Sequence, residues 1–168
     1  MVSRTVPTFR MPTWQELLGR PDTLRRAMNL WPPYRFAGIR VREIAPDYST
    51  AVVAMKLTPL NRNYVGTHFG GSLFSMADPF WMLLVMEQLG REYVVWDRRA
   101  EIEFVKPGRG EVRTEFVVDP AVIERIREAA AGGDKVLEWF ENEILDSGGD
   151  VVARVRRQLY VRRKRSTG

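Results

Sequence analysis

The chain has 168 residues, with no cysteine and a single histidine. This composition excludes disulfides, thiolate metal sites, cysteine nucleophiles and any site that needs several histidines. The formal net charge is +5, and the basic tail at residues 162–168 carries four of the positive charges, on residues 162–165. The length and the apolar content of 45% predict one globular domain over residues 1–168.

The first 35 residues predict a helical lead-in. Residues 1–12 contain Arg4, Pro7 and Arg10 and no apolar segment of the kind that a secretory signal needs, so we expect a cytoplasmic protein. A capping-box pattern at residues 13–16 predicts a short helix that ends near Gly19. A second helix is expected from Pro21 to about Leu30, because residues 31–33 (Trp-Pro-Pro) stop it.

Residues 38–44 and 50–58 alternate between apolar and polar side chains, which predicts two strands of a hairpin. After a loop at residues 59–69, residues 70–89 are apolar on nearly every side, as in a helix that is buried all round. This stretch has the length of a membrane span. Gly, Asp and Pro interrupt it, however, so we predict a core helix and no membrane span. Within it, Pro79 frees the carbonyl of Ser75.

Four more strands follow, at residues 93–106, 111–118, 137–145 and 151–163. Asp119 is the expected N-cap of a helix that ends at Gly132 and Gly133. The short turns imply an antiparallel sheet, and its apolar face must be covered. We therefore predict an α+β fold in which one curved antiparallel sheet wraps around helix 70–89. In the last strand, one face carries Val155, Leu159 and Val161, and the other carries Arg154, Arg156, Gln158 and Arg162.

A sheet wrapped around one long helix resembles the hotdog fold. Asn63, Gly66, Gly70 and Gly71, followed after six residues by Asp78, resemble the central motif of acyl-CoA thioesterases of the phenylacetate-degradation type. That motif places histidine directly before the glycine pair. Here Phe69 holds that position, and the histidine of this chain lies one residue earlier.

A closer resemblance is to a hotdog branch that is labelled a domain of unknown function and is thioesterase-like by assignment. It covers roughly residues 30–164. The segments that resemble this branch are residues 31–33, 38–41, 66–74, 76–80 and 159–164, and residues 104–108 resemble a turn of the superfamily.

The resemblance implies hydrolysis of an acyl-CoA thioester. Gly70 and Gly71 open the helix, where free N–H groups can stabilise an oxyanion; the other explanation of the pair is close packing. Asp78 lies eight residues after Gly70, about 12 Å along a helix, so it cannot easily serve its own helix N-terminus. The resemblance implies a site shared across a homodimer or a dimer of dimers. We expect Asp78 of one subunit to activate water, or to attack, at a thioester held by the glycines of the other. The alternative is a structural Asp78 that bonds a loop or a partner amide.

The other candidates also have a functional and a structural explanation. His68 either orients Asp78, contacts the thioester or only fixes its loop, and Asn63 either contacts substrate or pins loop backbone. Ser72 and Ser75 are candidates for hydrogen bonds to substrate. Phe74, Phe80 and Trp81 either line an acyl pocket or belong to the core. The candidates for binding the coenzyme A phosphates, which are otherwise surface charges, are Lys106, Arg109, Arg154 and Arg156.

The sequence leaves other functions open. A non-catalytic protein that binds an acyl thioester or a fatty acid is the main alternative to a thioesterase. A dehydratase is a weaker one, because the helix offers only Asp78 and Glu87 as acids. A nucleic-acid-binding module is weaker still, since no known motif accompanies the basic tail. We expect no metal and no cofactor apart from coenzyme A as part of the substrate.

Overall fold

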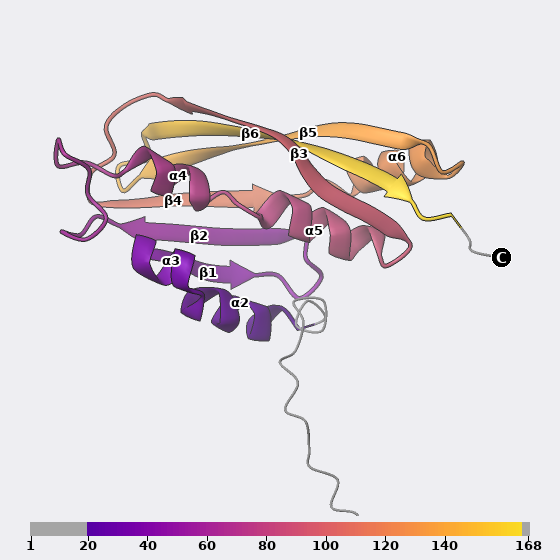
Figure 1. Cartoon of the computed structure of the whole chain (residues 1–168), viewed down its shortest axis with the longest axis horizontal. Helices are drawn as coiled ribbons and strands as arrows, with labels where there is room; N and C mark the ends of the chain where they lie inside the picture. Colours follow the sequence, from indigo (N-terminus) through magenta and orange to yellow (C-terminus); the bar gives the residue numbers. More distant parts are fainter. Residues whose placement is uncertain (1–19, 166–168) are drawn as a thin grey trace, which may run out of the picture.

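The computed structural model describes residues 20–165. The helix predicted for residues 13–19 lies outside the described residues. Six strands form one antiparallel sheet in the order β1-β2-β4-β5-β6-β3 (Figure 1). The strands are β1 (Ile39–Ile44), β2 (Thr50–Lys56), β3 (Tyr93–Phe104), β4 (Glu111–Val117), β5 (Lys135–Asp146) and β6 (Val151–Arg163). The helices are α2 (Pro21–Leu30), α3 (Pro32–Ala37), α4 (Gly70–Ser75), α5 (Phe80–Leu89) and α6 (Pro120–Ala130).

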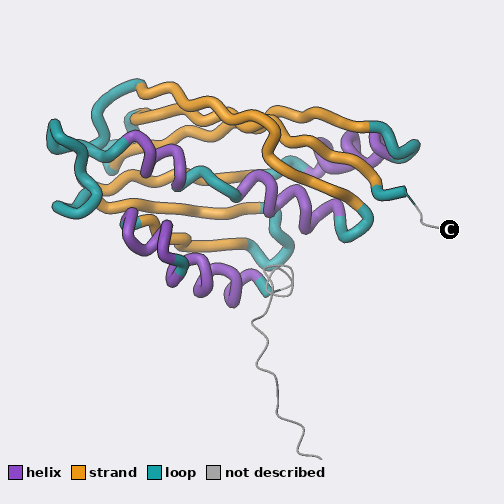
Figure 2. Tube along the Cα trace, in the orientation of Figure 1, coloured by secondary structure: helices purple, strands orange, loops and turns teal. Residues whose placement is uncertain are grey.

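The predicted architecture is confirmed: the sheet curves around the apolar stretch at residues 70–89, as in a hotdog fold (Figure 2). Helix α5 contacts β2, β3, β6 and α6. No described element lies over α4 and α5 on the side away from the sheet (Figure 1). One long face of the central helical stretch is therefore left without a covering layer among the described residues.

The central stretch is helical as predicted, but it is divided into two segments. Helix α4 ends at Ser75 and α5 begins at Phe80, with a turn over residues 76–79 between them. The physical reason is Pro79, which has no N–H to give to the Ser75 carbonyl. That carbonyl accepts the backbone N–H of Asp78 at 3.1 Å instead, which tightens the last turn of α4.

Helices α2 and α3 lie along β1 at one edge of the sheet (Figure 1). The side chain of Asn29 exchanges two hydrogen bonds with the backbone of Val41, at 3.0 and 2.9 Å, and so occupies the backbone of the edge strand. The prediction that the helix from Pro21 ends near Leu30 is confirmed. The following prolines open a short helix that the sequence did not predict, because proline is well tolerated in a first turn.

The core is a stack of aromatic rings from different elements. Phe80 stacks on Phe116 with centroids 5.0 Å apart, and Trp81 stacks on Phe140 at 4.9 Å. The indole N–H of Trp81 donates to the side-chain oxygen of Asn142 at 2.9 Å, so this buried donor is satisfied. Phe80 and Trp81 are thus core residues, as the structural explanation of them predicted.

A β-bulge interrupts the long pairing of β3 with β6 between Asp97 and Arg99. On one side of the bulge Asp97 lies opposite the buried Leu159, and on the other side Ala100 lies opposite Arg157. Since residues directly opposite in an antiparallel pair share a face, both Asp97 and Arg157 point to the helix side of the sheet. The extra residue changes which positions of β3 face inward, so Asp97 reaches the inner face.

The predicted N-cap of α6 is also confirmed. Asp119 caps α6 by accepting the backbone N–H of Ala121 at 2.9 Å. Among the described residues, no helix is long and apolar enough to cross a membrane.

Candidate active site

Asp78 lies in the turn between α4 and α5, where the central helical stretch is interrupted. Its side chain is 54% exposed, whereas the apolar surroundings of the sequence predicted burial. The difference arises because the helix break carries the residue to the uncovered side of the stretch. The hydroxyl of Tyr34, from α3, donates to the backbone carbonyl of Asp78. The backbone of the turn is therefore tied to α3 while its carboxylate stays accessible.

Arg157 on β6 forms an ion pair with that carboxylate from the sheet side. The residue is only 4% exposed and stands between the buried Val155 and Leu159 on the inner face of the sheet. Its Nη1 lies 3.5 Å from Oδ1 of Asp78 and 3.6 Å from Oδ2 of Asp97. Its guanidinium also lies over the ring of Phe74, 5.1 Å from the centroid. One buried cation is thus shared between two carboxylates.

Asp97 is the more deeply placed of the two acids, with a side chain 22% exposed. Burial raises the pKa of Asp97, the nearby Arg157 opposes that rise, and the negative charge of Asp78 adds to it. The pKa of Tyr34 depends on the same charges. Burial raises this pKa, the negative charge of Asp78 raises it further, and the positive charge of Arg157 lowers it. Tyr34, Asp78, Asp97 and Arg157 therefore form one electrostatically coupled group.

The two glycines at the start of α4 are packed against aromatic rings. A Cβ at Gly70 would lie 2.8 Å from the ring of Phe104, and one at Gly71 would lie 2.5 Å from the ring of Phe69. Real Cβ atoms do not approach so closely, which supports the close-packing explanation of the pair. Both phenylalanines are more than half exposed, so their rings are free to move aside on the solvent side.

His68 and Asn63 hold the loop that leads into α4. The His68 ring is buried, its Nε2 lies 3.0 Å from the carbonyl oxygen of Gly110, and burial lowers its pKa. The Asn63 side chain accepts the backbone N–H groups of Val65 and Thr67, and donates to the His68 carbonyl at 3.2 Å. Among residues 20–165, no hydrogen bond or ion pair joins His68 to Asp78. Both side chains thus act on the loop, as their structural explanations predicted.

The remaining candidates on the helices are buried or contact other residues of the chain. The Ser75 hydroxyl donates to the Gly71 carbonyl at 2.8 Å, and Ser72 is buried. Phe74 is half-buried beneath the Arg157 guanidinium, so it lies at the site. Trp81 is held in the core by Asn142 and does not line a pocket at Asp78.

The basic candidates for coenzyme A binding are scattered. Lys106 forms ion pairs with Asp146 and Asp150, at 2.7 and 2.6 Å. Arg154 and Arg156 are paired with glutamates of β3 and β5 on the outer face of the sheet. Arg109 is exposed and has no ion pair within the described part of the chain. Of the four, only Arg109 is without an ion-pair partner among the described residues.

A groove of about 720 Å³ runs over that outer face. Five glutamates and two arginines line it, which leaves an excess of negative charge that would repel phosphates. The groove is therefore unsuited to coenzyme A, and the candidate site stays on the helix side of the sheet. Its charged lining is Glu101, Glu103, Glu115, Glu141, Glu143, Arg154 and Arg156.

Sequence reasoning missed three members of the cluster: Tyr34, Asp97 and Arg157. Arg157 did carry a signal, because it occupies the inward-facing position between Val155 and Leu159 in a strand whose alternation was recognised. Asp97 carried none, since the bulge shifts the alternation of β3. Tyr34 follows two prolines in a segment that was expected to end a helix.

Comparisons with solved structures bear on the fold. The protein PA5026 of Pseudomonas aeruginosa, of unknown function and described as a probable thioesterase, has a TM-score of 0.75 and 21% identity over 92% of this chain and 99% of its own. A protein of unknown function from Chlorobaculum tepidum has a TM-score of 0.68 and 16% identity, over 86% of this chain and 97% of its own. The thioesterase HI1161 of Haemophilus influenzae has a TM-score of 0.62 and 12% identity, over 88% of this chain and 94% of its own.

At these identities the similarity concerns the fold alone. No curated protein matches the chain. A family model, by contrast, matches residues 20–161, which is most of the chain and includes every residue of the cluster around Asp78. The chain therefore belongs to the family described as Domain of unknown function (DUF4442).

Proposed function

We propose that the protein hydrolyses an acyl thioester, with acyl-CoA as the substrate class, and that Asp78 is its catalytic carboxylate. The observation that carries the proposal is the placement of Asp78: a half-exposed acid at a break in an otherwise apolar helix, held by a buried arginine. A buried arginine is costly unless its charge is compensated. Its presence beneath Asp78 is well explained by a need for an ionised carboxylate on this face.

The chemistry needs a base and an oxyanion site. In the water-mediated route, Asp78 accepts a proton from water, the hydroxide attacks the thioester carbon, and the carbonyl electrons move to oxygen. Collapse of that oxyanion expels the thiolate, which takes the proton from Asp78 and leaves a carboxylic acid and a free thiol. The backbone N–H groups at Gly70 and Gly71 are the proposed donors to the oxyanion.

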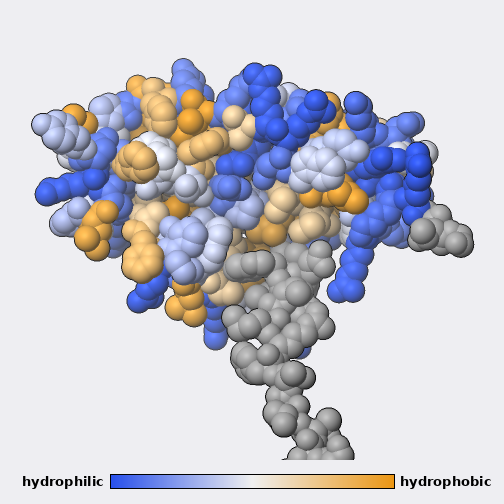
Figure 3. Space-filling model, in the orientation of Figure 1, coloured by the Kyte–Doolittle hydropathy of each residue, from blue (hydrophilic) through white to orange (hydrophobic). Residues whose placement is uncertain are grey.

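The uncovered face of α4 and α5 supports a homodimer in which each site takes Asp78 from one subunit and the glycines from the other. Strand β3 is an edge strand of the sheet, and an edge strand offers unpaired backbone groups to a second chain. Phe104 on β3 and Phe69 before α4, which flank the glycine pair, are exposed aromatic residues. Apolar residues gather over this face between charged margins (Figure 3), as at a protein interface.

The test is thiol release from a panel of short, long and aromatic acyl-CoA thioesters. Because the chain has no cysteine, a thiol reagent gives no background from the protein. We expect turnover by the wild type and a loss of about a hundredfold or more in Asp78→Asn, the range for a lost general base. Asp134→Asn, in an exposed turn, is the matched control and should leave the rate unchanged.

The outcomes separate the enzyme from its alternatives. Turnover that survives Asp78→Asn would reject the role of Asp78. No turnover on any thioester, with tight binding of acyl-CoA or of a fatty acid, would replace the hydrolase by a non-catalytic binding protein. Loss of the activity in Asp134→Asn as well would show that the assay reports folding and not chemistry.

A further inference from the structure

The arginine at the site is shared, and its geometry indicates a function for that sharing. Its contacts to Asp78 and Asp97 are 3.5 and 3.6 Å, both longer than the roughly 2.7–2.9 Å of a close charge-assisted hydrogen bond. A guanidinium that serves one carboxylate frequently faces it with two N–H groups. Here Nη1 of Arg157 lies at nearly equal distances from the two acids.

Asp97, the second acid, is placed by the β-bulge in β3. Without the bulge after Asp97, the alternation of β3 would turn this side chain away from Arg157. Two buried polar atoms of the pair, Oδ1 of Asp97 and Nε of Arg157, have no hydrogen-bond partner among the described residues. The pair is therefore incompletely satisfied, unlike an ion pair that only stabilises the core.

We propose that Arg157 is the positioning residue for the Asp78 carboxylate, and that Asp97 sets how much of the arginine's charge Asp78 receives. The proposal rests on the proposed function. When Asp97 is ionised, the two carboxylates compete for one cation. When Asp97 binds a proton, Asp78 has the guanidinium to itself and is held more firmly. Among residues 20–165, the other titratable group that faces the cluster is Tyr34 of α3, while α4 contributes the uncharged ring of Phe74.

The direct test is a carbon-13 NMR titration of the Asp97 carboxyl group, identified by its absence in Asp97→Asn. Removing the neighbouring negative charge in Asp78→Asn should lower the titration midpoint of Asp97. Removing the cation in Arg157→Met should raise it, by about one pH unit or more, and Arg157→Lys should restore most of the wild-type value. Arg163→Met is the matched control, because Arg163 lies on the same strand and pairs with Glu92 at the far end.

Steady-state kinetics test whether the coupling of Arg157 and Asp97 to Asp78 affects the rate of hydrolysis. For the substrate found above, Arg157→Met should lower kcat about tenfold or more with KM little changed, as expected when an interaction is lost in the transition state. Arg157→Lys should recover part of kcat. Asp97→Asn should flatten the pH dependence of kcat over the range in which Asp97 titrates.

The two arms keep this inference apart from the proposed function. The titration needs no substrate, so a wild type that hydrolyses no thioester would reject the function while the coupling could still be measured. An Asp97 midpoint that is the same in the wild type and in Asp78→Asn would overturn the inference. So would an Arg157→Met enzyme with the wild-type kcat. If Arg157→Met does not fold, the lysine variant and Asp78→Asn decide the outcome.

Discussion

His68 shows how a single residue can resemble a catalytic group and serve the fold. It is buried, its Nε2 lies 3.0 Å from the Gly110 carbonyl oxygen, and its backbone N–H donates to the Gly108 carbonyl at 3.0 Å. The loop that starts the central helix is thereby joined to the turn after β3. A buried histidine in this position is most stable when neutral, because no carboxylate contacts it among the described residues.

We expect stability to fall as the pH is lowered through the range in which this histidine binds a proton. Burial lowers its pKa in the folded state below the usual value near 6.5. As the pH falls, the unfolded chain therefore binds the proton before the folded chain does. The stability that neutral His68 contributes is present above about pH 6.5, the usual pKa of histidine, and is lost as the pH falls below it. Denaturant midpoints at pH 7.5 and pH 5 would measure the effect. As this is the only histidine of the chain, His68→Gln isolates it.

The variant should show a smaller loss between the two pH values than the wild type. The acids with raised pKa values, Asp97 and Glu87, titrate in both proteins, so they cancel in the difference. Equal losses in the two proteins would contradict this account of the histidine.

A second residue-scale prediction concerns the buried chain of polar groups behind Trp81. Asn142 accepts the Trp81 indole N–H at 2.9 Å and donates to the Thr114 hydroxyl at 2.7 Å. Asn142→Ala leaves a buried donor without an acceptor, which should cost about 1–3 kcal/mol of unfolding free energy. Chemical denaturation measures it, with the neighbouring outward-facing Glu143→Ala as the control, expected within about 0.5 kcal/mol of the wild type.

At the scale of an element, β3 shows how one extra residue decides a strand's inner face. Its bulge lies between Asp97 and Arg99, where Arg98 is the unpaired residue. Val95 and Asp97 face the core before the bulge, and Ala100 and Ile102 face it afterwards. Unbroken alternation carried back from Ala100 and Ile102 would instead put Asp97 on the outer face.

Deleting Arg98 should therefore destabilise the protein by roughly 3 kcal/mol or more, because the first half of β3 must then slip or turn its apolar side chains outward. The measurement is the denaturation midpoint. Deleting Gly132 from the exposed turn after α6 is the control and should cost much less. An Arg98 deletion with the wild-type midpoint would show that the bulge is not needed for the fold.

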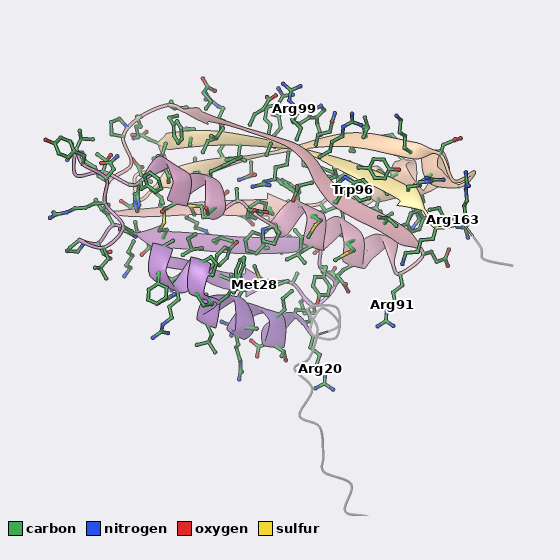
Figure 4. All side chains as sticks on the ribbon, in the orientation of Figure 1. Arg20, Met28, Arg91, Trp96, Arg99 and Arg163 are labelled. Carbon is green, nitrogen blue, oxygen red and sulfur yellow. The ribbon has the colours of Figure 1, made fainter. Side chains whose placement is uncertain are left out.

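At the scale of the whole molecule, the basic tail is partly tied to the body of the chain. Arg162 donates to the Gly133 carbonyl, Arg163 pairs with Glu92, and Lys164 donates to the Arg91 carbonyl. Figure 4 shows Arg91 and Arg163 at the same end of the molecule. These contacts hold residues 162–164 of the tail against the body of the chain.

The shared site can be tested by mixing two inactive variants, provided that the protein is a dimer of twice 19.4 kDa. Asp78→Asn and Gly71→Val each remove one half of the proposed site. In a mixed dimer one of the two sites receives both intact halves, so equimolar reassociation should recover about a quarter of the wild-type activity. No recovery after proven exchange of subunits would place the whole site within one chain.

The sequence by itself determined the order of the six strands, the curved sheet around an apolar helix, the cap of α6 and the place of Asp78 in the central helical stretch. These features follow from local signals: alternation, capping residues, glycines at turns and an acid in an apolar run. The site's surroundings could not be read in that way. Tyr34, Asp97 and Arg157 lie far from Asp78 in sequence, and only the pairing of β3 with β6, the bulge and the break before Pro79 bring them together. Strand register and a shift of alternation are set by contacts across the whole sheet, so the tertiary structure alone decided which charges face the catalytic candidate.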